Sequence, residues 1–154
     1  TPDELLIIYS DLKEYRAFLA NELIAKNIEE RLNMPVALNS MEIVDIKEQI
    51  KTVKSSKKRE YLLYGLYLAN LKIDSVTKLN EARKNIEYLD KKEKEKLTST
   101  ILNKFLNESD SVEENDYGYL KSVIGTVRNS IIRERLYQIL SDRYTYHNKV
   151  KRNS

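Results

Sequence analysis

Three consecutive cations, Lys57, Lys58 and Arg59, stand where the sequence predicts the start of a helix. The backbone N–H groups of a first helical turn have no partner inside the helix, so they attract anions together with the cations, and phosphate above all. Tyr64 and Tyr67 follow three residues apart and therefore lie on one side of the same helix. A ring beside cations offers a surface on which a base can stack, as in single-strand and nucleotide sites. The segment predicts a phosphate or nucleotide contact.

A structural interpretation of the same residues stays open. A basic run is often only a solvated surface with uneven charge, and tyrosine rings often pack in a core while their hydroxyl groups reach the surface. The two interpretations are compatible, because one face of a ring can pack while the other face stays exposed.

Groups that perform catalysis are scarce. The chain has no cysteine and a single histidine, His147, in a polar tail. It contains neither a glycine-rich phosphate loop nor a dinucleotide-binding fingerprint. The acids are spread along predicted helices instead of clustering as two-metal phosphoryl transfer requires. We therefore expect a non-catalytic protein with no metal site, no iron–sulfur cluster and no cofactor other than a bound nucleotide triphosphate.

Composition narrows the class of protein. Of the 154 residues, 41% are hydrophobic and 33% are charged, which is typical of one globular domain with a solvated surface. No apolar run approaches the ~20 residues of a membrane-spanning helix. Residues 1–33 do not form the apolar block of a secretory signal either. We expect a cytoplasmic protein without a membrane partner, and the excess of bases over residues 116–154 favours an anionic partner.

Apolar residues recur at helical spacing nearly throughout, so we expect an all-α fold, an irregular bundle of about six or seven helices. Residues 3–33 form one long amphipathic helix that Pro35 ends, and this helix is a candidate arm beside a helical domain over residues 34–154. No internal repeat is visible. The charged run Lys91–Lys96 is interpreted as a solvated helix face. Helix starts are predicted near Asn39, Lys57, Ser75 and Asp90, followed by a short segment at Tyr117–Gly125 and a last helix through Ile131–Leu140.

Two segments resemble one known family, the C-terminal domain of the large subunit of archaeal and eukaryotic primase. The first segment consists of Arg59, then Tyr64-Gly65-Leu66-Tyr67-Leu68, then Lys72-Ile73-Asp74-Ser75. The second consists of Tyr117-Gly118-Tyr119-Leu120-Lys121-Ser122 with Gly125 and Arg128. The resemblance covers about residues 38–145. The family's nearest Arg precedes the Tyr by three residues, where this chain has Tyr61, so Arg59 matches only with a shifted helix start.

The family domain is all-helical and holds an iron–sulfur cluster on four cysteines, none of which is present here. The chain therefore resembles the cluster-free third subunit of some archaeal primases, PriX. The resemblance implies an accessory subunit that binds the initiating nucleotide or the primer 5′-triphosphate. It also implies contact with template DNA and primer, and partnership with the catalytic and large primase subunits. The implied site residues are Lys57, Lys58, Arg59, Tyr64, Tyr67, Lys72, Arg83, Lys121, Ser122 and Arg128.

Two other functions remain open from the sequence. The first is a helical adaptor whose acidic first helix docks on a protein partner and whose bases are only solvated. The second is a nucleic-acid-binding protein that contacts only the phosphate backbone through residues 121–152.

Overall fold

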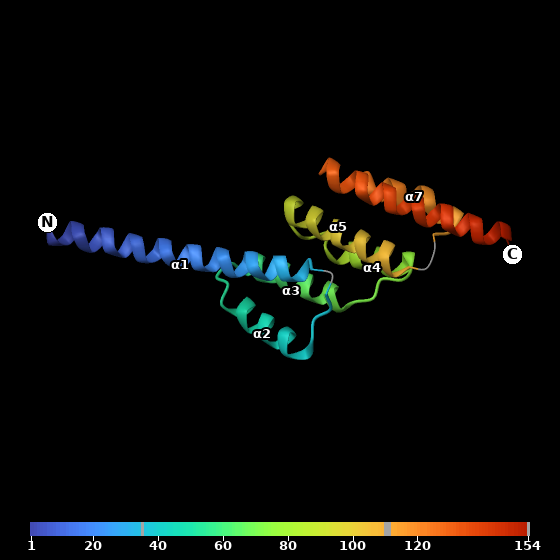
Figure 1. Cartoon of the computed structure of the whole chain (residues 1–154). Helices are drawn as coiled ribbons and strands as arrows, with labels where there is room; N and C mark the ends of the chain where they lie inside the picture. Colours follow the sequence, from blue (N-terminus) through green and yellow to red (C-terminus); the bar gives the residue numbers. More distant parts are fainter. Residues whose placement is uncertain (35, 110–111, 154) are drawn as a thin grey trace. The chain divides into compact units, whose positions relative to one another are not determined.

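The computed structural model describes residues 1–34, 36–109 and 112–153, with side chains through residue 144 (Figure 1). Over these ranges the chain forms seven α-helices and no strand, which confirms the all-α fold and the long first helix. None of these helices is long and apolar enough to cross a membrane. Pro35 lies outside the described residues. The helices are α1 (Pro2–Leu32), α2 (Ser40–Lys51), α3 (Ser56–Asn70), α4 (Val76–Asn85), α5 (Lys91–Glu108), α6 (Glu114–Ile124) and α7 (Ser130–Asn153).

Polar side chains fix the starts of the helices. Thr1 and Asn39 each accept a hydrogen bond from a backbone N–H in the first turn, and a glutamate three residues later completes a capping box. Ser75 and Asp90 accept the equivalent bonds at the starts of α4 and α5. Because these caps depend on local sequence, the starts predicted near Asn39, Ser75 and Asp90 agree with the observed ones. Helix α6 has no side-chain cap and begins at Glu114, three residues before the predicted segment.

The chain divides into two compact units, Thr1–Asn70 and Leu71–Ser154. The division falls after Asn70 and not after residue 33, because the C-terminal half of α1 packs against α2 and α3. Ala25 and Ile28 of α1 are buried, and Arg31 forms an ion pair with Glu42 of α2 at 2.7 Å. Only the N-terminal half of α1 therefore has the character of an arm.

The second unit is built around α5. Helix α4 packs against α5, α5 packs against α7, and α6 packs against α7. Apolar side chains from all four helices form its core. The largest fully buried side chains of this unit are Ile73, Leu79, Ile86, Ile101, Leu102, Leu106, Leu120 and Ile124.

The two units repeat the same helix–turn–helix, so the expectation that the chain has no internal repeat was wrong. Helices α2 and α3 match α6 and α7 at a constant separation, with no insertion in either copy. Nearly half of the positions from Lys47 to Leu66 are identical to their matches. The identical pairs are Lys47/Lys121, Ile50/Ile124, Thr52/Thr126, Val53/Val127, Ser56/Ser130, Arg59/Arg133, Glu60/Glu134, Leu62/Leu136 and Leu66/Leu140.

Matched residues also make matched contacts. The Thr52 hydroxyl donates to the Gln49 carbonyl at 2.6 Å, and the Thr126 hydroxyl donates to the Val123 carbonyl at 2.6 Å. The backbone N–H that follows each turn donates to a side chain of the preceding long helix, Asn21 of α1 in the first unit and Glu95 of α5 in the second. The core is shared too, since Ile46, Ile50, Val53, Leu62 and Leu66 are buried like their matches Leu120, Ile124, Val127, Leu136 and Leu140.

An arginine closes each turn. Arg59 donates from one guanidinium nitrogen to the carbonyls of Val53 and Lys54, the latter at 2.9 Å. Arg133 donates in the same way to the carbonyls of Val127 at 3.0 Å and Arg128 at 3.4 Å. A turn between helices leaves carbonyls without helical partners, and leaving such groups unpaired near a core costs free energy.

We expect Arg59→Ala and Arg133→Ala to lower the free energy of unfolding by about 1–2 kcal/mol each, because each substitution removes hydrogen bonds from two turn carbonyls. Chemical denaturation followed by circular dichroism measures the loss. The matched controls are Lys57→Ala and Arg135→Ala, which remove exposed cations on the same helices. Equal effects of the two arginines and their controls would contradict the turn-closing role.

The Arg31–Glu42 pair predicts a dependence of stability on pH. The Arg31 guanidinium donates to both oxygens of Glu42, and this hydrogen bonding holds the pKa of Glu42 below its ordinary value of 4.5. A carboxyl group whose pKa is lowered by folding stabilises the fold above its unfolded pKa, and the contribution is lost as pH falls through the folded value.

We therefore expect the wild type to have a higher free energy of unfolding than Glu42→Gln at about pH 7. This difference should shrink as the pH falls below about 4.5. Urea unfolding at a series of pH values measures it. Glu48→Gln is the control, because the Glu48–Lys51 pair is exposed and contributes little at any pH. A pH-independent difference for Glu42→Gln would refute the prediction.

Candidate functional site

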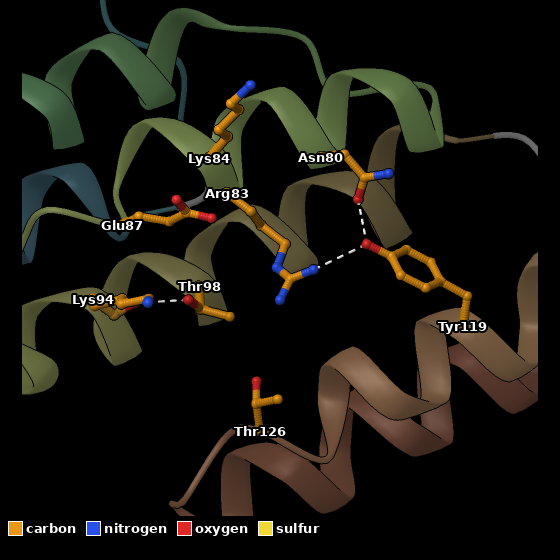
Figure 2. Close-up of a pocket in the computed structure, with 8 residues that line it drawn as sticks. All are labelled: Asn80, Arg83, Lys84, Glu87, Lys94, Thr98, Tyr119 and Thr126. Carbon is orange, nitrogen blue, oxygen red and sulfur yellow. Dashed lines mark hydrogen bonds between the residues drawn. The ribbon is translucent and has the colours of Figure 1, made fainter.

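The second unit contains a cleft formed by α4, α5, α6 and the turn after α6. It consists of two adjoining hollows of about 470 Å³ and 200 Å³, which share Lys94, Thr98 and Thr126. Figure 2 shows the larger hollow. Its lining residues are Asn80, Arg83, Lys84, Glu87, Lys94, Thr98, Tyr119 and Thr126, and the smaller hollow adds Lys91, Glu95, Val127 and Arg128.

Hydrogen bonds between helices hold Arg83 in place. Its guanidinium donates to the Tyr119 hydroxyl oxygen at 3.0 Å, and that hydroxyl donates in turn to the Asn80 side chain at 2.5 Å. Figure 2 shows the guanidinium directed toward Tyr119, between α4 and α6, while the ammonium of Lys84 points away from it. Arg83 uses one nitrogen for this bond, so its other N–H groups remain available to a ligand.

Positive charge dominates the cleft. Five of its side chains are cations, Arg83, Lys84, Lys91, Lys94 and Arg128, against the two carboxylates Glu87 and Glu95. Within the described part of the chain, none of these five cations forms an ion pair, whereas Arg31, Lys58 and Lys104 are each paired with a glutamate. Unpaired cations that line a hollow create a positive potential there, which attracts an anion, although Lys84 directs its ammonium away from Arg83.

The first turn of α5 brings lysines to this cleft. Asp90 caps α5 by accepting from the Glu93 N–H, so Lys91 and Lys94 fall one turn apart on the cleft side. The Glu95 carboxylate accepts a hydrogen bond from the backbone N–H of Arg128, which holds the turn after α6 beside α5. The arrangement can bind a polyphosphate through charge-assisted hydrogen bonds, which are the stronger class.

In the first unit, the structure assigns two of the predicted cations to structural contacts. Lys58 forms an ion pair with Glu29 at 3.0 Å and lies over the Tyr61 ring at 5.0 Å from its centroid. Arg59 closes the turn before α3. Lys57 is exposed in the first turn of α3. The predicted phosphate contact at the start of this helix is therefore reduced to one exposed lysine.

The predicted tyrosines lie together on α3. The rings of Tyr64 and Tyr67 are 5.6 Å apart between centroids and tilted by 43°. Tyr64 is half-buried, and 52% of Tyr67 is exposed. Both the packing and the stacking interpretation are compatible with these positions.

The remaining predicted residues belong to the second unit. Arg83 and Arg128 both line the cleft. Lys72 precedes α4 and is exposed, Lys121 is exposed on α6, and the Ser122 hydroxyl donates to the Tyr119 carbonyl at 2.6 Å. Of the ten predicted site residues, the structure thus brings Arg83 and Arg128 together at one cleft.

Lys84, Lys91 and Lys94 were not predicted as site residues, because Lys91–Lys96 was interpreted as a solvated helix face. Their spacing held a usable signal. Arg83 and Lys84 end one short helix and Lys91 and Lys94 begin the next, so an antiparallel packing of the two helices must bring these cations together.

Comparisons with protein families, with curated proteins and with solved structures find no match to this chain. Among the described residues, no three of the His, Cys, Asp and Glu side chains gather as they would around a metal ion. The side chain of His147 lies outside the described residues.

Proposed function

We propose that this protein is a non-catalytic cytoplasmic primase subunit that binds the triphosphate of an initiating nucleotide, or of a primer 5′ end, in the basic cleft of its second unit. The observation that carries the nucleotide part is Arg83, held by Tyr119 among cations that lack carboxylate partners within the described residues. The larger hollow of about 470 Å³ falls in the size range of small-molecule sites.

The primase part of the proposal is supported by sequence resemblance. The second family-like segment, Tyr117–Arg128, contributes Tyr119, Thr126 and Arg128 to the cleft lining. The first segment supports it less, because Arg59 is bonded to turn carbonyls. The proposal therefore assigns the triphosphate contact to Arg83, Lys94 and Arg128 instead of Lys57, Lys58 and Arg59.

The proposed mechanism is positional. A nucleotide held beside the active site of a separate catalytic subunit meets its reaction partner as if in one molecule, which lowers the entropic part of the barrier. In this proposal the metal-binding acids belong to that catalytic subunit. Template DNA and primer would contact the same basic surface.

We expect the protein to bind ATP more tightly than AMP at constant ionic strength, because the cations contact the β- and γ-phosphates. Arg83→Ala should weaken ATP binding about tenfold or more, the loss expected for a charge-assisted hydrogen bond. Tyr119→Phe should weaken ATP binding less than Arg83→Ala, because it removes only the hydrogen bond that holds the Arg83 guanidinium in place. Isothermal titration calorimetry measures these constants.

Lys57→Ala is the matched control, because it removes an exposed cation of the first unit, and it should leave ATP binding unchanged. Equal binding of ATP and AMP would refute a triphosphate site. Binding of single-stranded DNA that weakens steeply with salt, without a preference for ATP over AMP, would favour the backbone-binding alternative. If Lys57→Ala alone abolished ATP binding, the triphosphate site would lie at the start of α3 and not in the cleft.

We further expect the isolated chain to make no primers with any divalent metal, and to raise primer synthesis when added to the catalytic and large primase subunits. Arg83→Ala should reduce that stimulation while the three chains still co-purify. Primer synthesis by the isolated chain would contradict the accessory role. Failure to co-purify with both subunits would favour the adaptor alternative while leaving the nucleotide site in place.

A further inference from the structure

The N-terminal half of α1 exposes more apolar surface than any other described segment of the chain. Leu5, Ile8, Leu12, Tyr15 and Leu19 are between 46% and 68% exposed. In the first unit, every hydrogen bond and ion pair between α1 and another described element comes from Asn21 or a later residue. In Figure 1 the exposed half is the dark blue end of α1.

At the separation that relates α2 and α3 to α6 and α7, exposed residues of α1 align with buried residues of α4. The two segments share one identical pair, Leu5/Leu79, and the N-cap Thr1 aligns with Ser75. Leu79 and Ile86 are fully buried in the second unit, where α4 packs against α5. Their matches, Leu5 and Leu12, are 68% and 53% exposed. No described helix of the first unit covers Leu5 and Leu12 as α5 covers Leu79 and Ile86.

The first unit cannot fold this segment back as the second unit does. The turn between α4 and α5 ends at Asp90, which caps α5, and the match of Asp90 is Arg16, in the middle of a continuous helix. Without a cap or a turn residue at this point, α1 runs straight.

The receiving face has also changed. Helix α5 buries Ile101 and Phe105, whereas the matched positions on α1 are Asn27 and Arg31, and Arg31 is bonded to Glu42. The matching surface of α1 is therefore less apolar than that of α5, although Leu23 still matches the buried Leu97.

We propose that residues 4–19 of α1 form a parallel coiled coil with the same segment of a second copy of this chain. Leu5, Ile8, Leu12, Tyr15 and Leu19 follow the alternating three- and four-residue spacing of heptad positions a and d. At 3.6 residues per turn this seam lies on the side of α1 away from Ala25 and Ile28, so two copies can join without disturbing either first unit.

Charge specifies the parallel orientation. With Leu5 and Leu12 at position a, Asp11 occupies g and Arg16 occupies e, and a parallel pair places each Asp11 beside Arg16 of the other copy. An antiparallel pair would place Glu4 and Asp11 near the same acids of the other copy. Phe18 occupies the next g position and adds to the apolar contact, which ends at Leu19 because the next d position is Glu22.

Sedimentation equilibrium of the full chain tests the proposal. The wild type should have a mass about twice 18.1 kDa at micromolar concentrations. Leu12→Glu should be monomeric with unchanged helix content, because the packing of the first unit begins at Asn21. Ser10→Glu, on the outer face of the same helix, is the matched control and should remain dimeric. A monomeric wild type, or a dimer that Leu12→Glu leaves intact, would overturn the proposal.

Two further variants test the orientation. Asp11→Arg alone should weaken association by about two- to tenfold through repulsion, and adding Arg16→Asp should restore it. Since the chain has no cysteine, Leu5→Cys introduces a single thiol, and a parallel pair brings two of these thiols together. Rapid formation of a disulfide-linked dimer is expected. A dimer in which Leu5→Cys forms no disulfide would rule out the parallel arrangement.

Discussion

Each unit of this protein depends on an arginine that reaches back from one helix to the end of the turn before it. Arg59 and Arg133 satisfy carbonyls that the preceding helix leaves unpaired, and both lie in the first turn of a long helix. The bond fixes the exit of α2 relative to α3, and of α6 relative to α7. The buried residues flanking each turn, Ile50 and Val53 or Ile124 and Val127, can then pack in one arrangement.

This structural use of arginine determines where a ligand can bind. A guanidinium that already donates to two carbonyls has fewer N–H groups left for phosphate, and moving it would expose the turn. Lys58 is likewise bonded to Glu29. Arg83 in the cleft closes no turn, since its guanidinium is bonded only to the Tyr119 hydroxyl within the described residues. Anion binding therefore fits the second unit better than the start of α3.

Local sequence predicted the helices well and their tertiary relations poorly. Caps such as Asn39 and Asp90 act within four residues, so these helix starts can be predicted from the local sequence. The division after Asn70 depends on which face of α1 is covered, and a long helix with apolar residues on several sides does not reveal that. The repeat was not recognised because the identical residues are concentrated in one stretch, Lys47–Leu66 and its match, where they alternate with residues that differ.

For a related reason, only some of the cleft residues could be predicted from the sequence. Arg83 and Arg128 were identified from the sequence, but Lys94 was interpreted as solvated, because a charged helix face looks the same whether it meets water or lines a cleft. Only the packing of α4 on α5, which brings Lys94 opposite Arg83, separates these cases. The spacing of the cations at the end of α4 and the start of α5 indicates such a contact only once an antiparallel packing of the two helices is assumed.

The two copies share a core and differ on their surfaces in a consistent way. Arg83 and Lys94, which line the cleft, match Tyr9 and Ala20 of α1. The cap that turns α4 back on α5 is missing from α1, so the first copy has a straight apolar helix where the second has a basic hairpin. In the first copy the absence of the turn goes together with the absence of the hollow and with the exposure of the apolar residues on α1. The same repeat can thus supply both proposed activities, self-association from the copy that lacks the hairpin and anion binding from the copy that keeps it.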